Sequence, residues 1–226
     1  MNLRRLKHEL HIAWRRYQLS QLKFRSGLGD SGWFLHGLVR SMKPEACVEI
    51  GSAHGYSTCL ISLALKLNLK GRLWAVDPHI PNSWSDTDPE NTFENLKANL
   101  ARLDLSARVE IVRKTSSQAT EDLPSKIDFA FIDGDHSYEG VKTDWEIISS
   151  RMAPFGIIVF HDTMWDRNSD SPYYQKYRDK NMRVPVLMEE LRLQGYPIVT
   201  INSDWGLSLL QLPRGGESFT TPSSPT

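Results

Sequence analysis

The sequence predicts an α/β fold: a doubly wound, mostly parallel seven-stranded sheet with helices on both faces and an N-terminal helical extension. Short apolar runs typical of strands alternate along the chain with segments of helical periodicity. The inner strands are apolar at nearly every position, as expected where helices cover both faces of a parallel sheet. The 226 residues, 40% hydrophobic and 24% charged, suit one such domain with appendages.

Three regions are expected: a helical extension over 1–43, the α/β domain over 44–212, and a tail over 213–226 that is rich in Pro, Gly, Ser and Thr and is predicted to be disordered. In the extension, apolar residues at helical spacing predict an amphipathic helix over 3–24 (Leu3, Leu6, Leu10, Trp14 and Tyr17). Its outer face is basic. We favour packing of this helix on the domain or on a second copy of the chain, which would give a homodimer; a membrane surface or an anionic partner is the alternative.

The other elements follow in order. A second helix is predicted over 30–42, before Pro44. Strands are predicted at 46–50, 73–76, 109–112, 127–132, 155–160, 197–201 and 206–212. Helices are predicted at 55–67 and near 184–194, and a short one from near Ser116. Another is predicted to begin after Asp88, which would cap it, with Pro89 at its first position. A further helix is predicted after the fourth strand, with Val141, Trp145 and Ile148 on one face.

Composition narrows the classes of function. Twenty-seven Lys and Arg balance twenty-seven Asp and Glu, so the overall charge argues neither for nor against a nucleic-acid partner, and none is expected. No apolar run approaches the ~20 residues of a transmembrane helix, and the N-terminus lacks the apolar core of a signal peptide. Cys47 and Cys59 lie in apolar segments and are expected to be buried and unpaired. The cytoplasm is the expected location.

Acidic residues stand where the first two strands end. In EIGSAHGYST (49–58), Gly51 and Gly55 bracket a tight turn, but their spacing does not match a dinucleotide-binding fingerprint. Glu49 there favours a positively charged ligand, and Asp77 is well placed to bind ribose hydroxyls. Together they suggest S-adenosylmethionine, with Ser116 and Ser117 near the adenine. Each also has a structural interpretation, because Asp and Ser commonly form turns and helix caps.

Four segments, taken in order, carry a resemblance to a known family: VEIGSAHGYST, AVDPH, FIDGDHSYEG and IIVFHDT. The chain resembles the class I S-adenosylmethionine-dependent methyltransferases over about residues 45–162. More narrowly, it resembles the metal-dependent small-molecule O-methyltransferases of the catechol and caffeoyl-CoA, macrolide-sugar and cephalosporin-hydroxylase-like types. The resemblance implies a methyltransferase domain over 44–212 and an enzyme that methylates a hydroxyl.

The resemblance also implies roles for particular residues. Glu49, Gly51, Ser52, Gly55, Tyr56 and Ser57 would surround the methionine part of the cofactor, Asp77 its ribose and Ser116 its adenine. Asp133 would be the first metal ligand and would also border the cofactor, with His161 and Asp162 as further ligands. Mg²⁺ is the ion that the family suggests, but the imidazole of His161 suits zinc, iron or nickel, so other divalent ions stay open. His161 could instead face the substrate.

The chemistry of methyl transfer assigns a further role. A free alcohol or phenol is a poor nucleophile at neutral pH, so a metal held by carboxylates or a nearby imidazole has to assist the loss of its proton. His136, three residues after Asp133, is the candidate base. Asp135 is interpreted as a turn or cap residue. Taken alone, Asp133-Gly134-Asp135 would favour a simple turn, because Asp and Gly are the commonest turn residues; the acidic residues at the neighbouring strand ends favour the functional interpretation.

The acceptor is the least determined part. Residues 163–181 are polar and aromatic, as an acceptor-binding loop or lid would be, with Trp84 from another loop. Trp165, Tyr173, Tyr174 and Tyr177 could stack on a ring or form the loop's own core. A sugar or glycosylated natural product is favoured, and a catechol-like phenol is next. Two other functions stay open, a nicotinamide-dependent oxidoreductase on a similar sheet and a non-catalytic homologue that binds the cofactor.

Overall fold

The computed structural model describes residues 26–80, 91–165, 181–203 and 205–212. Several predictions concern residues outside these ranges. They are the helix over 3–24 with its packing on the domain or on a second copy, the Asp88–Pro89 cap, Trp84, the three tyrosines of 173–177 and the tail from 213. The elements, with their bounds, are η1 (Gly29–Ser31), α2 (Gly32–Met42), β1 (Ala46–Ile50), α3 (Tyr56–Asn68), β2 (Arg72–Val76), α4 (Thr92–Arg102), η3 (Ser106–Arg108), β3 (Val109–Val112), β4 (Ile127–Ile132), α5 (Tyr138–Ser149), β5 (Met152–Phe160), α7 (Val184–Leu193), β6 (Ile198–Ile201) and β7 (Leu207–Gln211).

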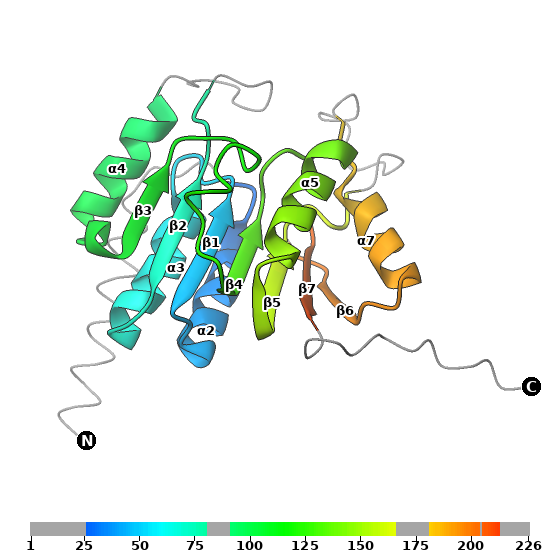
Figure 1. Ribbon diagram of the computed structural model, residues 1–226. Coiled ribbons are helices and arrows are strands. Elements are labelled where there is room, and N and C mark those ends of the chain that lie inside the picture. Colours follow the sequence, from blue (N-terminus) through cyan, green and yellow to red (C-terminus); the bar gives the residue numbers. More distant parts are fainter. Residues whose placement is uncertain (1–25, 81–90, 166–180, 204, 213–226) are drawn as a thin grey trace, which may run out of the picture.

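The seven strands form one sheet in the order β3-β2-β1-β4-β5-β7-β6 (Figure 1). The first five in this order are parallel to one another, whereas β7 runs antiparallel to both β5 and β6. The strand order reverses between β1 and β4, because the chain first builds β2 and β3 on one side of β1 and then places β4 on the other. The predicted mostly parallel, seven-stranded sheet is confirmed.

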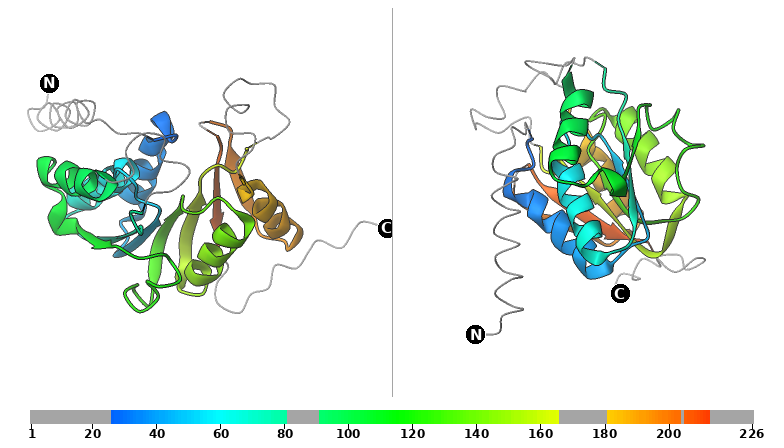
Figure 2. Two further views of the ribbon diagram at one scale, coloured as in Figure 1. Left: turned by 90° about the horizontal axis from the view of Figure 1, so that it is seen from above. Right: turned by 90° about the vertical axis from the view of Figure 1, so that its left-hand side faces the viewer.

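Helices cover both faces of the sheet (Figure 2). On one face, α2, α3 and α4 pack on side chains that include Phe129 and Phe131 of β4. On the other, α5 and α7 pack on Ala130 and Ile132 of the same strand. Alternate residues of β4 thus point into two different cores, and burying each large apolar side chain contributes roughly 1.5–3 kcal/mol. This explains why the strand is apolar throughout instead of alternating.

Two elements differ from their predictions. The segment after Ser116 forms successive turns and no helix, since Ala119 bonds back to Thr115 but the pattern does not continue. The fifth strand starts at Met152 instead of 155, with a register shift opposite Ile127–Phe129. Pro154 falls in this irregular part, where the lack of a backbone N–H is tolerated.

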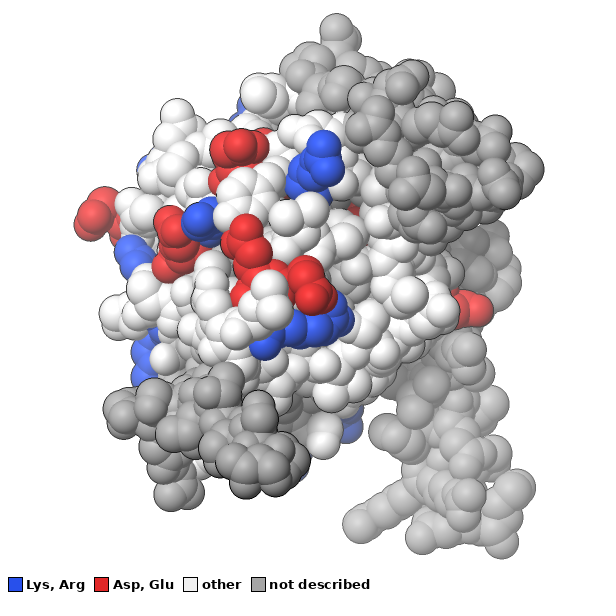
Figure 3. All heavy atoms as spheres, turned by 90° about the vertical axis from the view of Figure 1, so that its right-hand side faces the viewer, with Lys and Arg blue, Asp and Glu red and all other residues white. Residues whose placement is uncertain are grey.

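Charges of both signs are mixed on the face seen from the α7 side (Figure 3). Arg192, for example, lies 3.7 Å from Glu189 on α7. Among the described residues of this face, no patch of a single charge sign stands out. Within the described ranges, none of the helices combines the length and the apolar composition needed to cross a membrane.

Candidate active site

A pocket of about 650 Å³ opens at the carboxyl ends of the parallel strands. The loops after β1, β2, β3, β4 and β5 all contribute to its wall, together with Ser26–Gly27, Met182 and Trp205. Ligands of open α/β sheets bind at this edge, next to the point where strand order reverses. The volume lies within the roughly 300–1,000 Å³ common for small-molecule sites.

The turn after β1 forms one side of the pocket. Gly51 has φ +87°, and a Cβ there would collide with the backbone carbonyl oxygen of Asp133, so only glycine lets the ends of β1 and β4 approach this closely. Ser52 is buried, and its hydroxyl has no hydrogen-bond partner among the described residues although it lines the pocket. Ser57 and Tyr56 also line it, and the Tyr56 hydroxyl donates to the carbonyl of Gly29 at 2.9 Å.

Gly55 lies at the start of α3 and not in the pocket wall. Its φ is also +87°, and a Cβ there would collide with Leu96 of α4. Its glycine is therefore explained by helix packing. The sequence predicted that Gly55 contacts the cofactor, whereas in the structure Gly55 does not line the pocket.

Glu49 is wholly buried and lies outside the pocket wall. Thr58 donates a 2.6 Å hydrogen bond to its Oε2, and its Oε1 has no partner within the described part of the chain. Burial raises the pKa of Glu49 to about 8; hydrogen bonds from Ser57 and Thr58 oppose this, and the charges of Asp133 and Asp77 add to it. Glu49 therefore lies beneath the turn after β1, with one carboxylate oxygen unpaired in the described part of the chain.

Asp77, by contrast, lines the pocket at the end of β2. Its Oδ2 accepts the backbone N–H of Ala53 at 2.8 Å and its Oδ1 that of His79 at 2.7 Å. Asp77 thus fixes the β1 turn against the β2 loop, which is the turn-forming role that its sequence context also allowed. A carboxylate has about four acceptor positions, so two stay available for ligand hydroxyls.

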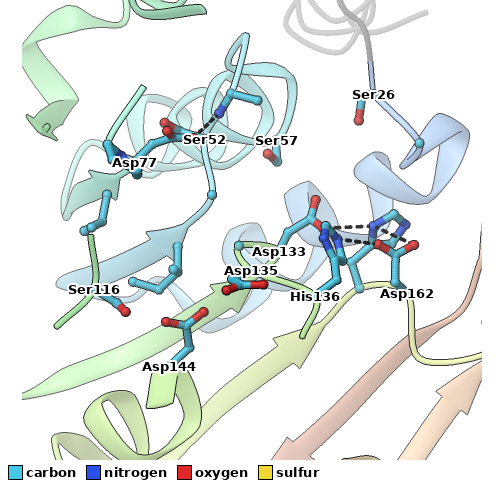
Figure 4. A pocket seen from close by; sticks show the side chains of 18 of the residues that line it. Ser26, Ser52, Ser57, Asp77, Ser116, Asp133, Asp135, His136, Asp144 and Asp162 are labelled. Atoms are coloured by element: carbon cyan, nitrogen blue, oxygen red, sulfur yellow. Dashed lines mark hydrogen bonds and ion pairs between the residues drawn. The ribbon is translucent and has the colours of Figure 1, made fainter. Parts of the chain in front are cut away.

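Four titratable side chains meet at the ends of β4 and β5 (Figure 4). His136 Nε2 lies 2.6 Å from Asp162 Oδ2 and 3.5 Å from Asp133 Oδ1. His161 Nδ1 lies 3.1 Å from Asp133 Oδ1 and 3.6 Å from Asp162 Oδ1. Two imidazoles therefore alternate with two carboxylates at the edge of the pocket.

The backbone at this place is strained. Asp162 has φ +57°, in the left-handed region that costs a non-glycine residue roughly 1–2 kcal/mol. This conformation follows directly on β5 and turns the carboxyl toward His136. Strain of this kind often occurs at functional sites, where the surrounding structure holds it in place.

Each charge in the group stabilises its opposite. Burial opposes ionisation of Asp133, but the charge of His161 and hydrogen bonds with His136 and His161 bring its pKa well below the usual range. Burial likewise opposes protonation of His136, yet hydrogen bonds and charges from Asp133 and Asp162 raise its pKa to about 10. At neutral pH, His136 in this arrangement therefore already carries the proton that a general base would have to accept.

Three of these side chains could hold a metal ion. Asp133, His136 and Asp162 each offer one ligand atom, and all three atoms lie within 4.8 Å of one another. Two carboxylates and one imidazole fit a divalent cation of the transition series or zinc, and fit Mg²⁺ less well. This group contains His136 from the β4 loop in addition to the predicted Asp133 and Asp162, and the predicted His161 lies beside it, with Nδ1 3.1 Å from Asp133 Oδ1.

Of the remaining residues predicted from the sequence, some line the pocket and one forms a turn. Ser116 lines the pocket as expected, and the backbone N–H of Ser137 donates to Asp135 Oδ1 at 2.9 Å, as expected of a turn residue. Of the aromatic candidates, Trp165 lines the pocket, stacked in parallel on Trp205 with ring centroids 4.3 Å apart.

Sequence reasoning missed Asp144 in the pocket wall. It lies on the buried face of α5 with Val141, Trp145 and Ile148. The sequence did contain an indication of this role, because Asp144 is a charged residue on a helix face that is otherwise apolar. The spacing alone could have singled it out.

Comparison with known proteins gives the family. Residues 48–163, just over half of the chain, match the sequence model of a family described as a methyltransferase domain. A protein of Sinorhizobium fredii, described as uncharacterized, is 29% identical over 140 residues, which cover 59% of this chain and 15% of that protein. The flavonoid 3',5'-methyltransferase of Vitis vinifera is 23% identical over 142 residues, which cover 60% of this chain and 54% of that enzyme. The chain thus spans about half, or less, of the length of these curated relatives.

Solved structures show the same fold. The O-methyltransferase TomG from Streptomyces achromogenes, involved in tomaymycin synthesis and solved in complex with SAM, superposes with a TM-score of 0.61. It is 17% identical, and the match covers 88% of this chain and 85% of that one. At this identity the likeness shows the fold alone.

Proposed function

Because the chain belongs to the methyltransferase domain family and has the class I fold of S-adenosylmethionine-dependent methyltransferases, we propose that it methylates a hydroxyl oxygen of a small molecule. One observation carries the proposal. Asp133, His136 and Asp162 form a metal-capable group in the same pocket as Asp77 and the turn after β1. A site for the methyl donor and a site that can activate a hydroxyl would then share one cavity.

The residues fit S-adenosylmethionine in their chemistry. The donor supplies a methyl group on a positively charged sulfur; transfer breaks this carbon–sulfur bond, forms a carbon–oxygen bond and releases the hydroxyl proton. Asp77 would bind the ribose with its remaining acceptor positions, and the unpartnered Ser52 hydroxyl would meet the methionine part. The acidic wall of the pocket would favour the positive charge of the donor over neutral analogues.

The group at β4 and β5 would activate the acceptor. Asp133, His136 and Asp162 would hold a divalent cation, which lowers the pKa of a hydroxyl bound to it. His161 would orient Asp133 through their 3.1 Å contact. With the negative charge of both carboxylates taken up in this way, His136 would no longer be held in its protonated form. His136 would then have one of two roles. It would bind the cation, or it would accept the hydroxyl proton while the two carboxylates bind the cation.

We propose a sugar or glycosylated natural product as the favoured acceptor, with a phenol next. The stacked Trp165–Trp205 pair at the pocket suits the flat face of either ring. The flavonoid 3',5'-methyltransferase of Vitis vinifera supports the phenol, because its name states a flavonoid acceptor and flavonoids carry aromatic rings.

Mass spectrometry of methyl transfer to a panel of sugars and phenols, with and without chelator, tests the proposal. We expect product with at least one hydroxyl acceptor, loss on chelation, and recovery with a divalent ion. Asp133→Asn should lower kcat/KM by roughly 100-fold or more, since it removes a charged member of the activating group. Glu110→Gln is the matched control, because it removes the same charge from an exposed pair with Arg72.

Two outcomes would contradict the proposal. Binding of the demethylated cofactor without turnover on any hydroxyl, unaffected by chelator, would favour the non-catalytic homologue. Tight binding of a nicotinamide dinucleotide instead would favour the oxidoreductase.

A further inference from the structure

Asp144 is a buried carboxyl group, one of whose oxygens has no hydrogen-bond partner among the described residues. The residue is 3% exposed and lies in the second turn of α5, on the helix face that packs against the sheet. Its Oδ2 has no hydrogen-bond partner in the described ranges. A buried acceptor that is left unpaired destabilises the protein, so a ligand that donates a hydrogen bond to it would bind more tightly.

The carboxyl lies in the wall of the pocket, on the side away from the metal-capable group. Figure 4 shows it pointing from α5 toward the space shared with Ser116 and Asp135. Gly134 lies next to this carboxyl: a Cβ at position 134 would come within 3.0 Å of Asp144 Oδ2 and of Ile50 Cγ2. Glycine at 134 therefore keeps side-chain bulk away from the carboxyl.

The surroundings define what could bind there. The adjoining pocket wall contains the apolar side chains of Ile50 and Val76, and Ser116 provides a hydroxyl. Burial raises the pKa of Asp144 to about 6, a hydrogen bond with Ser116 opposes this, and the charge of Asp135 adds to it. A ligand that binds at this carboxyl would therefore donate a hydrogen bond to it and place an otherwise apolar group against Ile50 and Val76.

We propose that Asp144 accepts a hydrogen bond from the exocyclic amino group of the cofactor's adenine, and so selects adenine over other purines. This inference rests on the proposed function, because it places the adenine beyond the ribose bound by Asp77 and next to Ser116. The amino group at C6 is a donor, whereas hypoxanthine carries an acceptor oxygen at the same position. Asp144 would thus be a specificity-determining residue of the cofactor site.

Titration calorimetry with two ligands tests the assignment. The first is S-adenosylhomocysteine; the second is its analogue with hydrogen in place of the amino group at C6 of the purine. We expect the protein to bind the adenine compound roughly 10- to 100-fold more tightly, which is the range for a hydrogen bond to a charged group. Asp144→Ala should reduce this ratio to near one, and Asp144→Asn, which keeps an acceptor oxygen, should give an intermediate ratio.

Asp135→Asn is the matched control, since it removes the same charge from the same part of the pocket wall. It should change both affinities alike and keep their ratio. Equal binding of both ligands by the unmodified protein would overturn the inference without any variant, so the test holds even if Asp144→Ala does not fold. A ratio unchanged in the Asp144 variants would also overturn it.

The failure of this inference can be distinguished from that of the proposed function. If S-adenosylhomocysteine does not bind at all, the proposed function fails and the assignment of Asp144 fails with it. If it binds but the amino group makes no difference, only the assignment of Asp144 is wrong.

Discussion

At the scale of single residues, two acids at neighbouring strand ends behave differently because of what surrounds them. Asp77 accepts two backbone N–H groups and lines the pocket. Glu49 is enclosed by the core, where Thr58 donates to its Oε2 and its Oε1 has no partner among the described residues. Hydrogen bonds compensate a carboxylate for its lost hydration, and Glu49 has too few of them. The carboxylate of Asp77 is therefore compensated in its charged form and lines the pocket, whereas that of Glu49 favours its protonated form.

Glu49 should make the stability of the protein depend on pH. Its pKa is about 8 in the folded protein against 4.5 for the unperturbed group, so the folded state keeps a proton that the unfolded state loses over this interval. The free energy of unfolding should fall with rising pH by up to about 1.4 kcal/mol per unit from this group, and level off above about 8. In Glu49→Gln this contribution is absent.

Urea unfolding of both proteins at several pH values measures the difference. We expect Glu49→Gln to gain stability over the unmodified protein as the pH rises from 4.5 toward 8. The exposed Glu110→Gln should show no such trend. Parallel stability curves for Glu49→Gln and the unmodified protein would contradict the burial argument.

At the scale of elements, the joint between β1 and β4 sets the geometry of the pocket. The N–H of Asp133 donates to the carbonyl of Ile50 at 2.8 Å, and that of Gly51 to the carbonyl of Val76 at 2.9 Å. The three strand ends are therefore locked together where the chain leaves the sheet. Gly51 allows this, because it adds no side chain at the point of closest approach.

Gly51→Ala tests how strictly this joint is built. The new Cβ would meet the backbone of Asp133 at a φ of +87°, so neither a side-chain rotation nor an ordinary backbone conformation relieves it. We expect a loss of about 2 kcal/mol or more in the free energy of unfolding, from the conformational cost and the collision together. Chemical denaturation measures it.

Gly37→Ala provides the control in the same chain. Gly37 lies within α2, and nothing stands within 4 Å of where its Cβ would be. The same substitution there should stabilise the protein by roughly 0.5–1 kcal/mol through helix propensity. Equal effects at the two positions would mean that the joint is less constrained than its geometry indicates.

At the scale of the whole molecule, the order of the strands creates the site. β1 lies in the middle of the parallel part of the sheet, with β2 on one side and β4 on the other. The connections on the two sides pass over opposite faces of the sheet, so the loops diverge and leave a cavity between them. The antiparallel β6 and β7 extend the sheet, and Trp205 in the turn between them reaches the pocket.

Ligand-induced stabilisation tests this arrangement as a whole. S-Adenosylhomocysteine at ~100 times its Kd should stabilise the folded protein by about 2.7 kcal/mol. For a chain of this size that corresponds to a rise in Tm of roughly 5–11 °C. NAD⁺ at the same concentration should leave Tm unchanged. A shift with NAD⁺ and none with S-adenosylhomocysteine would contradict the placement of the cofactor.

Much of the fold could be predicted from the sequence because periodicity reports burial. β4 is apolar at both alternating sets of positions, which requires cover on both faces, and the helix after it shows its core residues at regular spacing. Ser116 shows the limit. It was expected to begin a helix, but a helix depends on a run of consecutive bonds, and this short segment makes only separate turns.

The sequence alone determined the order of the elements, the carboxyl ends as the functional edge and most of the residues that gather there, since each depends on local composition. The tertiary structure decided which residues touch: that His136 joins Asp133 and Asp162 in the metal-capable group with His161 beside it, that Glu49 lies outside the pocket wall, and that Asp144 faces into the pocket. Contact between side chains from different elements depends on packing over distances that no local pattern records. For that reason the strand ends could be identified from the sequence, whereas their relation to one another could not.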